Sequence, residues 1–78
     1  MAKVLLFGSL ADTAGWRERE INGDSVAALL TILAQDERLA ERLSQPGLMT
    51  VVNQVVVRGD CAVGSDDEVA FAPPVSGG

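Results

Sequence analysis

The sequence ends in Glu68-Val69-Ala70-Phe71-Ala72-Pro73-Pro74-Val75-Ser76-Gly77-Gly78, and this stretch decides the fold that we predict. Residues 68–72 predict a final β-strand, with Val69 and Phe71 on one face. Pro73-Pro74 ends this strand, because proline has no backbone N–H to donate to a sheet. The last strand is therefore followed at once by a stiff spacer and a terminus without side chains.

The chain has 78 residues, enough for one small domain. We place a folded domain at residues 1–74 and a flexible tail at residues 75–78. A domain of this size buries a modest core, so its stability is expected to be marginal.

Working back from the last strand, the sequence predicts further strands. Residues 48–52 and 55–57 are β-branched runs separated by Asn53-Gln54, which is typical of a short strand pair or a bulged strand. Residues 3–7 predict a first strand that is apolar on both faces. Residues 16–21 are mostly charged and suit an edge strand, because charges discourage unwanted pairing.

Helical spacing appears between these strands. Ser25 or Asp24 caps a main helix, whose core-facing stripe comprises Val26, Leu29, Leu30, Leu33 and Ala34. Residues 36–43 predict a second helical piece, and residues 9–15 predict a short helical turn that ends at Gly15. The resulting order, β-β-α-β-β-β, indicates a two-layer α+β fold with a mixed sheet of four to five strands packed on one main helix. A β-grasp topology is compatible with this pattern but is not forced by it.

The first strand also predicts an exposed apolar surface. Residues 4–7 are apolar on both sides, whereas one helix covers only one face of a sheet. We therefore expect an apolar patch on the other face, available to a partner.

Composition excludes several functions. The net charge of −5 disfavours nucleic-acid binding, and the chain lacks an apolar run of the roughly 20 residues that span a membrane. All basic residues lie at or before Arg58, so the acidic C-terminal quarter indicates either a basic partner surface or a solvated face.

Catalytic and metal sites are also disfavoured. The chain has no histidine, which excludes Ser-His and Cys-His catalysis, and its one cysteine cannot supply a structural zinc site. We predict no bound metal or cofactor. Cys61 is either a reactive thiol or, as we favour, a small half-buried apolar side chain. A single cysteine fits a reducing cytoplasm.

The remaining chemical group is the terminal carboxylate of Gly78. Gly77-Gly78 is thin enough to enter a channel where any Cβ would collide, and a carboxylate can be activated as an acyl-adenylate by another enzyme. The alternative is a frayed end that happens to be glycine.

The C-terminal stretch, Asp67 to Gly78, closely resembles that of molybdopterin synthase small subunits, which are ubiquitin-like sulfur carriers. Val52-Asn53-Gln54 and the opening Lys3–Phe7 resemble the same family, so the likeness covers nearly the whole chain. The implied fold is β-grasp.

The resemblance implies a mechanism. An adenylating, E1-like enzyme uses ATP and magnesium to activate Gly78, and a sulfurtransferase leaves a thiocarboxylate there. The tail, Val75, Ser76 and Gly77 included, enters the large synthase subunit and gives sulfur to cyclic pyranopterin monophosphate. The assembly would be a heterotetramer, and this chain a non-catalytic subunit. Partner contacts would come from Phe7, Phe71, Ala72, Pro73 and Pro74.

Two departures from the family bear on partner affinity. Many relatives carry an aromatic residue where this chain has Ala72, and Leu10-Ala11-Asp12 lacks a basic residue that relatives often show. Other functions stay open: a sulfur carrier for thiamine thiazole or cysteine synthesis, a protein modifier that forms isopeptide bonds, or a passive interaction domain.

Overall fold

A computed structural model of the chain describes residues 1–74. In this part of the chain the elements follow in the order β1 (Ala2–Leu6), α1 (Ser9–Ala14), β2 (Glu18–Ile21), α2 (Val26–Leu33), α3 (Glu37–Leu43), β3 (Met49–Val52), β4 (Val55–Val57) and β5 (Glu68–Ala72). The α+β class predicted from the sequence is confirmed, and the strands form one mixed sheet.

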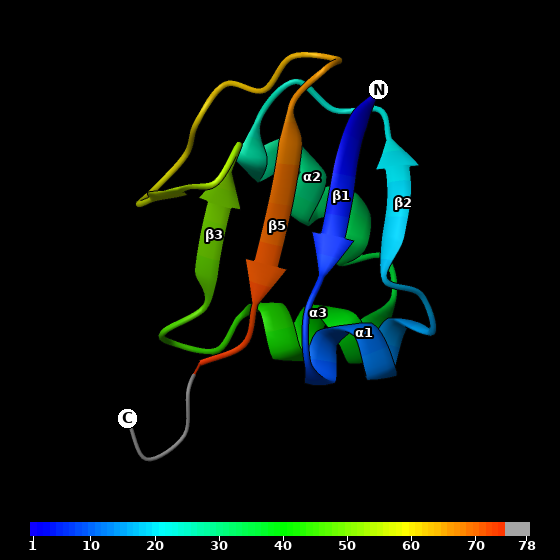
Figure 1. The fold of residues 1–78 in the computed structure, drawn as a ribbon. Helices are drawn as coiled ribbons and strands as arrows, with labels where there is room; N and C mark the ends of the chain where they lie inside the picture. The colour runs from blue at the N-terminus through cyan, green and yellow to red at the C-terminus, as the bar shows by residue number, and fades with distance from the viewer. Residues whose placement is uncertain (75–78) are drawn as a thin grey trace.

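The sheet places the last strand at its centre. Its order is β2-β1-β5-β3-β4, with β5 parallel to β1 and antiparallel to β3 (Figure 1). The predicted edge strand is confirmed, because β2 pairs only with β1 among the described strands. The chain that leads into the C-terminus therefore leaves from the middle of the sheet.

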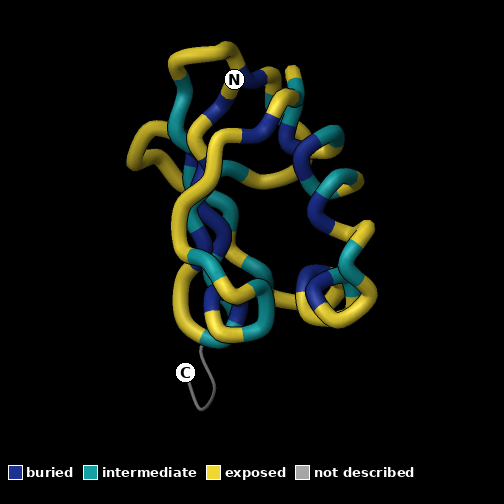
Figure 2. Tube along the Cα trace, turned by 90° about the vertical axis from the view of Figure 1, so that its right-hand side faces the viewer, coloured by how far each residue is buried: buried dark blue, intermediate teal, exposed yellow. Residues whose placement is uncertain are grey.

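The helices lie on one side of this sheet, and the other side is left uncovered (Figures 1 and 2). Strand alternation sends Val4 and Leu6 into the core, whereas Leu5 is half-buried and Phe7 is 51% exposed. The largest fully buried side chains are Phe71, Leu6, Leu10, Leu29, Leu39, Val4 and Val69. The core thus lies between β1, β5 and the helices.

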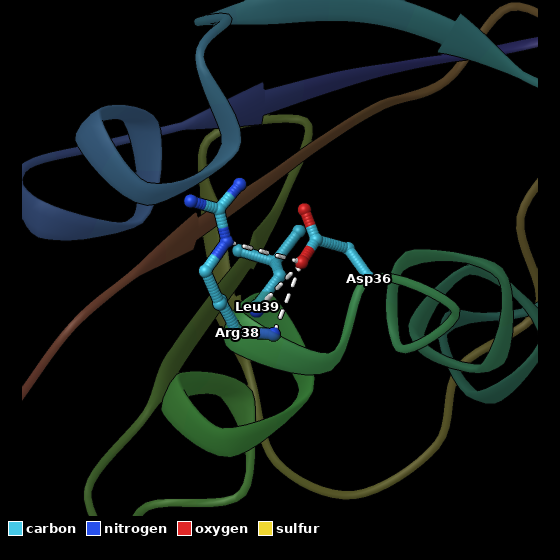
Figure 3. A network of polar contacts seen from close by, with 3 residues as sticks. All are labelled: Asp36, Arg38 and Leu39. Atoms are coloured by element: carbon cyan, nitrogen blue, oxygen red, sulfur yellow. Dashed lines mark hydrogen bonds and ion pairs between the residues drawn. The ribbon is translucent and has the colours of Figure 1, made fainter.

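Each longer helix begins at a polar cap. The Ser25 hydroxyl accepts from the Ala28 N–H at 3.0 Å and starts α2. Asp36 Oδ1 accepts from the N–H groups of Arg38 at 3.0 Å and Leu39 at 3.4 Å, which starts α3 (Figure 3). Of the stripe predicted for α2, Val26, Leu29 and Leu33 are buried, but Ala34 is exposed because the helix ends before it.

The β3–β4 connection is a two-residue hairpin turn, so the strand pair is confirmed and the bulged strand is not. Asn53 and Gln54 have φ of 49° and 70°, as a tight turn matching the sheet twist requires. Asparagine adopts such a φ more readily than most residues.

Candidate functional site

The candidate site is the place where the chain leaves β5. Val69 and Phe71 have no exposed surface, and the Phe7 N–H donates to the Phe71 carbonyl at 3.1 Å. These contacts hold the exit end of the strand. The predicted acceptor Gly78 and the tail residues Val75, Ser76 and Gly77 lie outside the described residues, so their roles stay predictions.

The Pro73-Pro74 spacer is half-buried. It follows Ala72, which pairs with Met49 of β3 and is itself half-buried. The spacer therefore rests against the body of the domain, with Figure 1 showing it at the end of the sheet that carries α1 and α3.

Phe71 was predicted to contact a partner, and this prediction is wrong for the folded chain, because Phe71 is not at the surface. Its side chain is 0% exposed, because position 71 falls on the helix-covered face of a central strand. Phe7, by contrast, is 51% exposed and lies on the uncovered side. Ala72, Pro73 and Pro74 are partly accessible between these extremes. The structure therefore separates a core phenylalanine from a surface one.

Part of the outer face of the sheet is apolar, as predicted, whereas the part beside β2 is charged and carries Lys3, Glu18 and Glu20. The register places Leu5, Ala70, Val51 and Val56 in one row across four strands. A second row pairs Ala72 with Met49, and Phe7 follows Leu5 on the same face. We call this set the outer patch; its most exposed members are Val56 at 57%, Phe7 at 51% and Met49 at 44%.

A hollow adjoins the outer patch beside Phe7. Its volume is about 420 Å³. Its lining includes the apolar residues Leu5, Phe7 and Ala11 and the charged residues Asp12 and Arg17. A hollow lined by both apolar and charged side chains is suited to receiving a side chain from a protein partner. The segment Leu10-Ala11-Asp12 lacks the basic residue that relatives often show, but Arg17 lines the same hollow as Asp12 and places a positive charge near this segment.

A polar clasp closes the opposite end of β5. Asn53 donates from Nδ2 to Asp67 Oδ1 at 2.9 Å and accepts from the Glu68 N–H at 2.9 Å. The Gly64 N–H donates to Asp67 Oδ2 at 2.7 Å. The bond from Gly64, followed by that from Asn53, lowers the pKa of the Asp67 carboxyl below its ordinary value. Sequence reasoning missed this clasp, although an asparagine in a two-residue turn was a usable signal.

The remaining reactive groups form no second site. Cys61 is half-buried and its thiol lies 3.5 Å from the Ala62 carbonyl oxygen, in keeping with the apolar role that we favoured. Within residues 1–74, no group of three or more cysteine, aspartate or glutamate side chains is arranged to hold a metal ion. No helix in this range is long and apolar enough to cross a membrane.

Comparison with known proteins identifies the family. The sequence pattern of the ThiS family matches residues 4–78. The chain belongs to the ThiS family. This match includes the Gly77-Gly78 terminus and all five strands, except for the first two residues of β1.

Two curated relatives narrow the likeness within the ThiS family. The chain is 40% identical to the molybdopterin synthase sulfur carrier subunit of Escherichia coli (strain K12), over all of both chains. It is 32% identical to the protein of the same name from Haemophilus influenzae, again over all of both chains. The resemblance stated from the sequence is therefore confirmed.

A solved structure supports the ubiquitin-like β-grasp fold. The small archaeal modifier protein 1 from Methanosarcina acetivorans matches with a TM-score of 0.82 and 25% identity, over 99% of this chain and 95% of that one. This ThiS-family chain thus shares its fold with a protein that is named a modifier.

Proposed function

We propose that this ThiS-family chain is the sulfur carrier of a molybdopterin synthase and carries sulfur on Gly78. The observation that carries the proposal is the 40% identity, without truncation on either side, to a molybdopterin synthase sulfur carrier subunit. The central position of β5 supports it, because a strand held on both edges gives a rigid base to a reactive terminus.

The proposed chemistry proceeds in balanced steps on the Gly78 carboxylate. A carboxylate oxygen attacks the α-phosphorus of ATP, and pyrophosphate leaves with magnesium bound to the activating enzyme. A persulfide of a sulfurtransferase then attacks the acyl carbon, and AMP leaves. A thiol reduces the resulting acyl disulfide, which gives the thiocarboxylate and a protein disulfide. These steps need groups that the described residues of this chain do not provide, so they fall to partners.

The second half of the function is delivery of the sulfur. The thiocarboxylate sulfur attacks a carbon of cyclic pyranopterin monophosphate inside the large subunit, and the carbon–oxygen bond at that carbon breaks, so that the oxygen substituent leaves with its electron pair. Water then cleaves the acyl–sulfur bond and restores the Gly78 carboxylate. Two such transfers complete a dithiolene. We place this carrier in the cytoplasm, in a heterotetramer of two large and two small subunits.

The outer patch supports docking to the large subunit. Its exposed side chains, Phe7, Met49 and Val56, form an apolar area next to the hollow at Phe7 and on the face that the helices leave open. An interface of ordinary size buries roughly 1,600 Å² in total and would cover this area. We therefore expect partner binding to raise the melting temperature of the carrier.

Intact mass tests the assignment of Gly78. The chain is co-expressed with its activating enzyme and sulfurtransferase, beside a Cys61→Ser variant as control. We expect both proteins to gain the mass difference between sulfur and oxygen, localised to the C-terminal peptide. Added sulfur that maps to Cys61 in the wild type and is lost in the variant would show a persulfide carrier instead.

A protein modifier is the second candidate, favoured by the likeness to small archaeal modifier protein 1. Self-conjugation would be limited to the N-terminus or to Lys3, the one lysine, whose ammonium lies 3.7 Å from Glu18 Oε2. Lysine-linked conjugates that disappear on deletion of Gly78 would support this candidate. If no lysine-linked conjugates form and Gly78 carries a thiocarboxylate, the result would support the sulfur-carrier function instead.

A further inference from the structure

Two turns that are distant in sequence touch the Pro73-Pro74 spacer, and each does so at a glycine. Gly8 joins β1 to α1 with a φ of 57°, and Gly47 joins α3 to β3 with a φ of 89°. A methyl group added at Gly8 would lie 3.2 Å from Pro73 Cγ. One added at Gly47 would lie 3.2 Å from Pro74 Cβ. Carbon atoms pack best at roughly 3.5–4.0 Å, so a methyl group at either turn would push the facing proline ring away by a few tenths of an ångström.

Backbone hydrogen bonds hold the first of these turns against the sheet. The Gly8 carbonyl accepts from the N–H groups of Ala11 at 3.1 Å and Asp12 at 3.3 Å. One residue earlier, the Phe7 N–H donates to the carbonyl of Phe71 at 3.1 Å, and Phe71 lies two residues before Pro73. The Gly8 turn is therefore tied both to α1 and to β5, and it cannot shift without disturbing one of them.

The second turn approaches the spacer from the β3 side. Gly47 lies two residues before β3, whose first residue, Met49, pairs with Ala72 of β5. The two glycines thus contact consecutive prolines from two separate connections of the fold. We call this arrangement the glycine seat: Gly8 against Pro73, and Gly47 against Pro74.

We propose that Gly8 and Gly47 are positioning residues for sulfur transfer, because they fix the point and direction at which the chain leaves the domain. This inference rests on the proposed function. Proline has a locked φ, so a proline ring held in place also sets the direction of the chain beyond it. The four residues after Pro74 reach at most roughly 14 Å, so a displacement of the point where the chain leaves the domain takes away reach that the terminal atom needs inside the partner.

The experiment compares two pairs of glycines that all have a positive φ. Gly8→Ala and Gly47→Ala introduce a Cβ into the seat. Gly15→Ala and Gly59→Ala are the controls, because they also place an alanine at a positive φ, of 83° and 77°. Gly8 has a ψ of −133° against 13° at Gly15, so Gly8→Ala carries additional backbone strain, which a Pro73→Ala background separates from the contact. No atom of residues 1–74 beyond their chain neighbours lies within 4 Å of a Cβ at either control position.

Single-turnover sulfur transfer to the large subunit is the readout, using carrier whose thiocarboxylate was prepared chemically. A displacement of about 1 Å at a reacting atom can cost about a hundredfold in rate, so we expect the seat variants to lose at least about tenfold. The controls should stay within about twofold of the wild type, although all four variants melt at lower temperature. Equal losses in all four would overturn the proposal.

Rescue by a second substitution separates positioning from general damage. Pro73→Ala removes the Cγ and Cδ atoms that the new methyl group at Gly8 would meet. Gly8→Ala should therefore reduce sulfur transfer by a smaller factor in a Pro73→Ala background than in the wild type, whereas the effect of Gly15→Ala should be the same in both backgrounds. A Gly8→Ala defect that is the same with and without Pro73 would show that the contact has no role.

The failure of the proposed function would look different. Wild-type thiocarboxylate that transfers no sulfur would refute the carrier assignment itself. Thermal unfolding of the wild type, Gly8→Ala, Pro73→Ala and the double variant would then still test the contact in the glycine seat. Coupling between the two substitutions would support the contact, and additive losses of stability would contradict it.

Discussion

The two ends of β5 are held by different kinds of contact. Where the strand begins, Asn53, Asp67 and Gly64 form a clasp of hydrogen bonds at the surface. Where it ends, Pro73 and Pro74 lie against Gly8 and Gly47 with apolar contacts. The first end closes the fold, and the second sets the origin of the reactive terminus. We therefore expect changes at the first end to affect stability and changes at the second to affect sulfur transfer.

The largest expected effect is at the exit end. Gly77→Val should reduce sulfur transfer by at least about a hundredfold, because a β-branched side chain widens and stiffens the arm where the partner's channel must be narrow. The core side chains that the structure describes all precede Pro74, so the free energy of unfolding should change by no more than about 0.5 kcal/mol. Unchanged turnover would show that the tail does not enter a tight channel.

Adjacent valines of β4 test the outer patch. Val56 belongs to the patch and is 57% exposed, whereas Val55 faces the other side of the sheet and is 62% exposed. Val56→Glu should weaken binding of the large subunit by about tenfold or more, since it buries a charge in an apolar interface. Val55→Glu is the matched control and should bind normally. Isothermal titration measures both, and equal affinities would place the interface elsewhere.

At the entry end, Asn53 provides the next effect. Asn53→Ala loses the acceptor for the Glu68 N–H and strains a backbone with φ of 49°, which together should cost about 1–2 kcal/mol of unfolding free energy. Asn53→Gly removes the same amide but relieves the strain, so it should be the more stable of the two. Below their melting temperatures, both variants should transfer sulfur at the wild-type rate. A slower rate at such a temperature would contradict the idea that the start of β5 affects only stability.

The smallest effect is the pH dependence of the clasp. The pKa of Asp67 is lower in the folded state than its ordinary value of 3.8. Its contribution to stability is therefore fully present above that value and is lost as the pH falls through the folded pKa. Asp67→Asn should be less stable than the wild type near neutral pH, and the difference in melting temperature should narrow as the pH falls below 3.8 and through the folded-state pKa. A gap that stays constant with pH would mean that the charge of Asp67 contributes nothing.

The elements of this fold were predictable because each has a local signal. Charges marked β2 as an edge strand, Gly15 ended α1 in the left-handed conformation, and Leu39 and Leu43 marked the buried face of α3. No local sequence pattern predicts the central position of β5, because its neighbours, β1 and β3, come from opposite halves of the chain. The resemblance to a known family implied a β-grasp fold, and the structure supplies the pairing of β5 with β1 and β3.

The site was less predictable, because its contacts join residues that are distant in sequence. The family resemblance placed Phe71 at a partner surface, yet its side chain is buried, because residue type alone does not tell which face a central strand buries. Likewise, the pairing of Asn53 with Asp67 and of Gly8 with Pro73 depends on strand register. Sequence identified the reactive end, and the structure identifies what holds it.

The most direct test of the carrier function follows the sulfur itself. Carrier with a thiocarboxylate on Gly78 is mixed with the large subunit and cyclic pyranopterin monophosphate in the absence of ATP, and the intact mass of the carrier is followed alongside the product. We predict that the carrier returns to the carboxylate mass as sulfur appears in the pterin, with two carriers consumed for each dithiolene. A carrier that keeps its sulfur while bound to the large subunit, or that loses it equally fast without the pterin, would contradict the account.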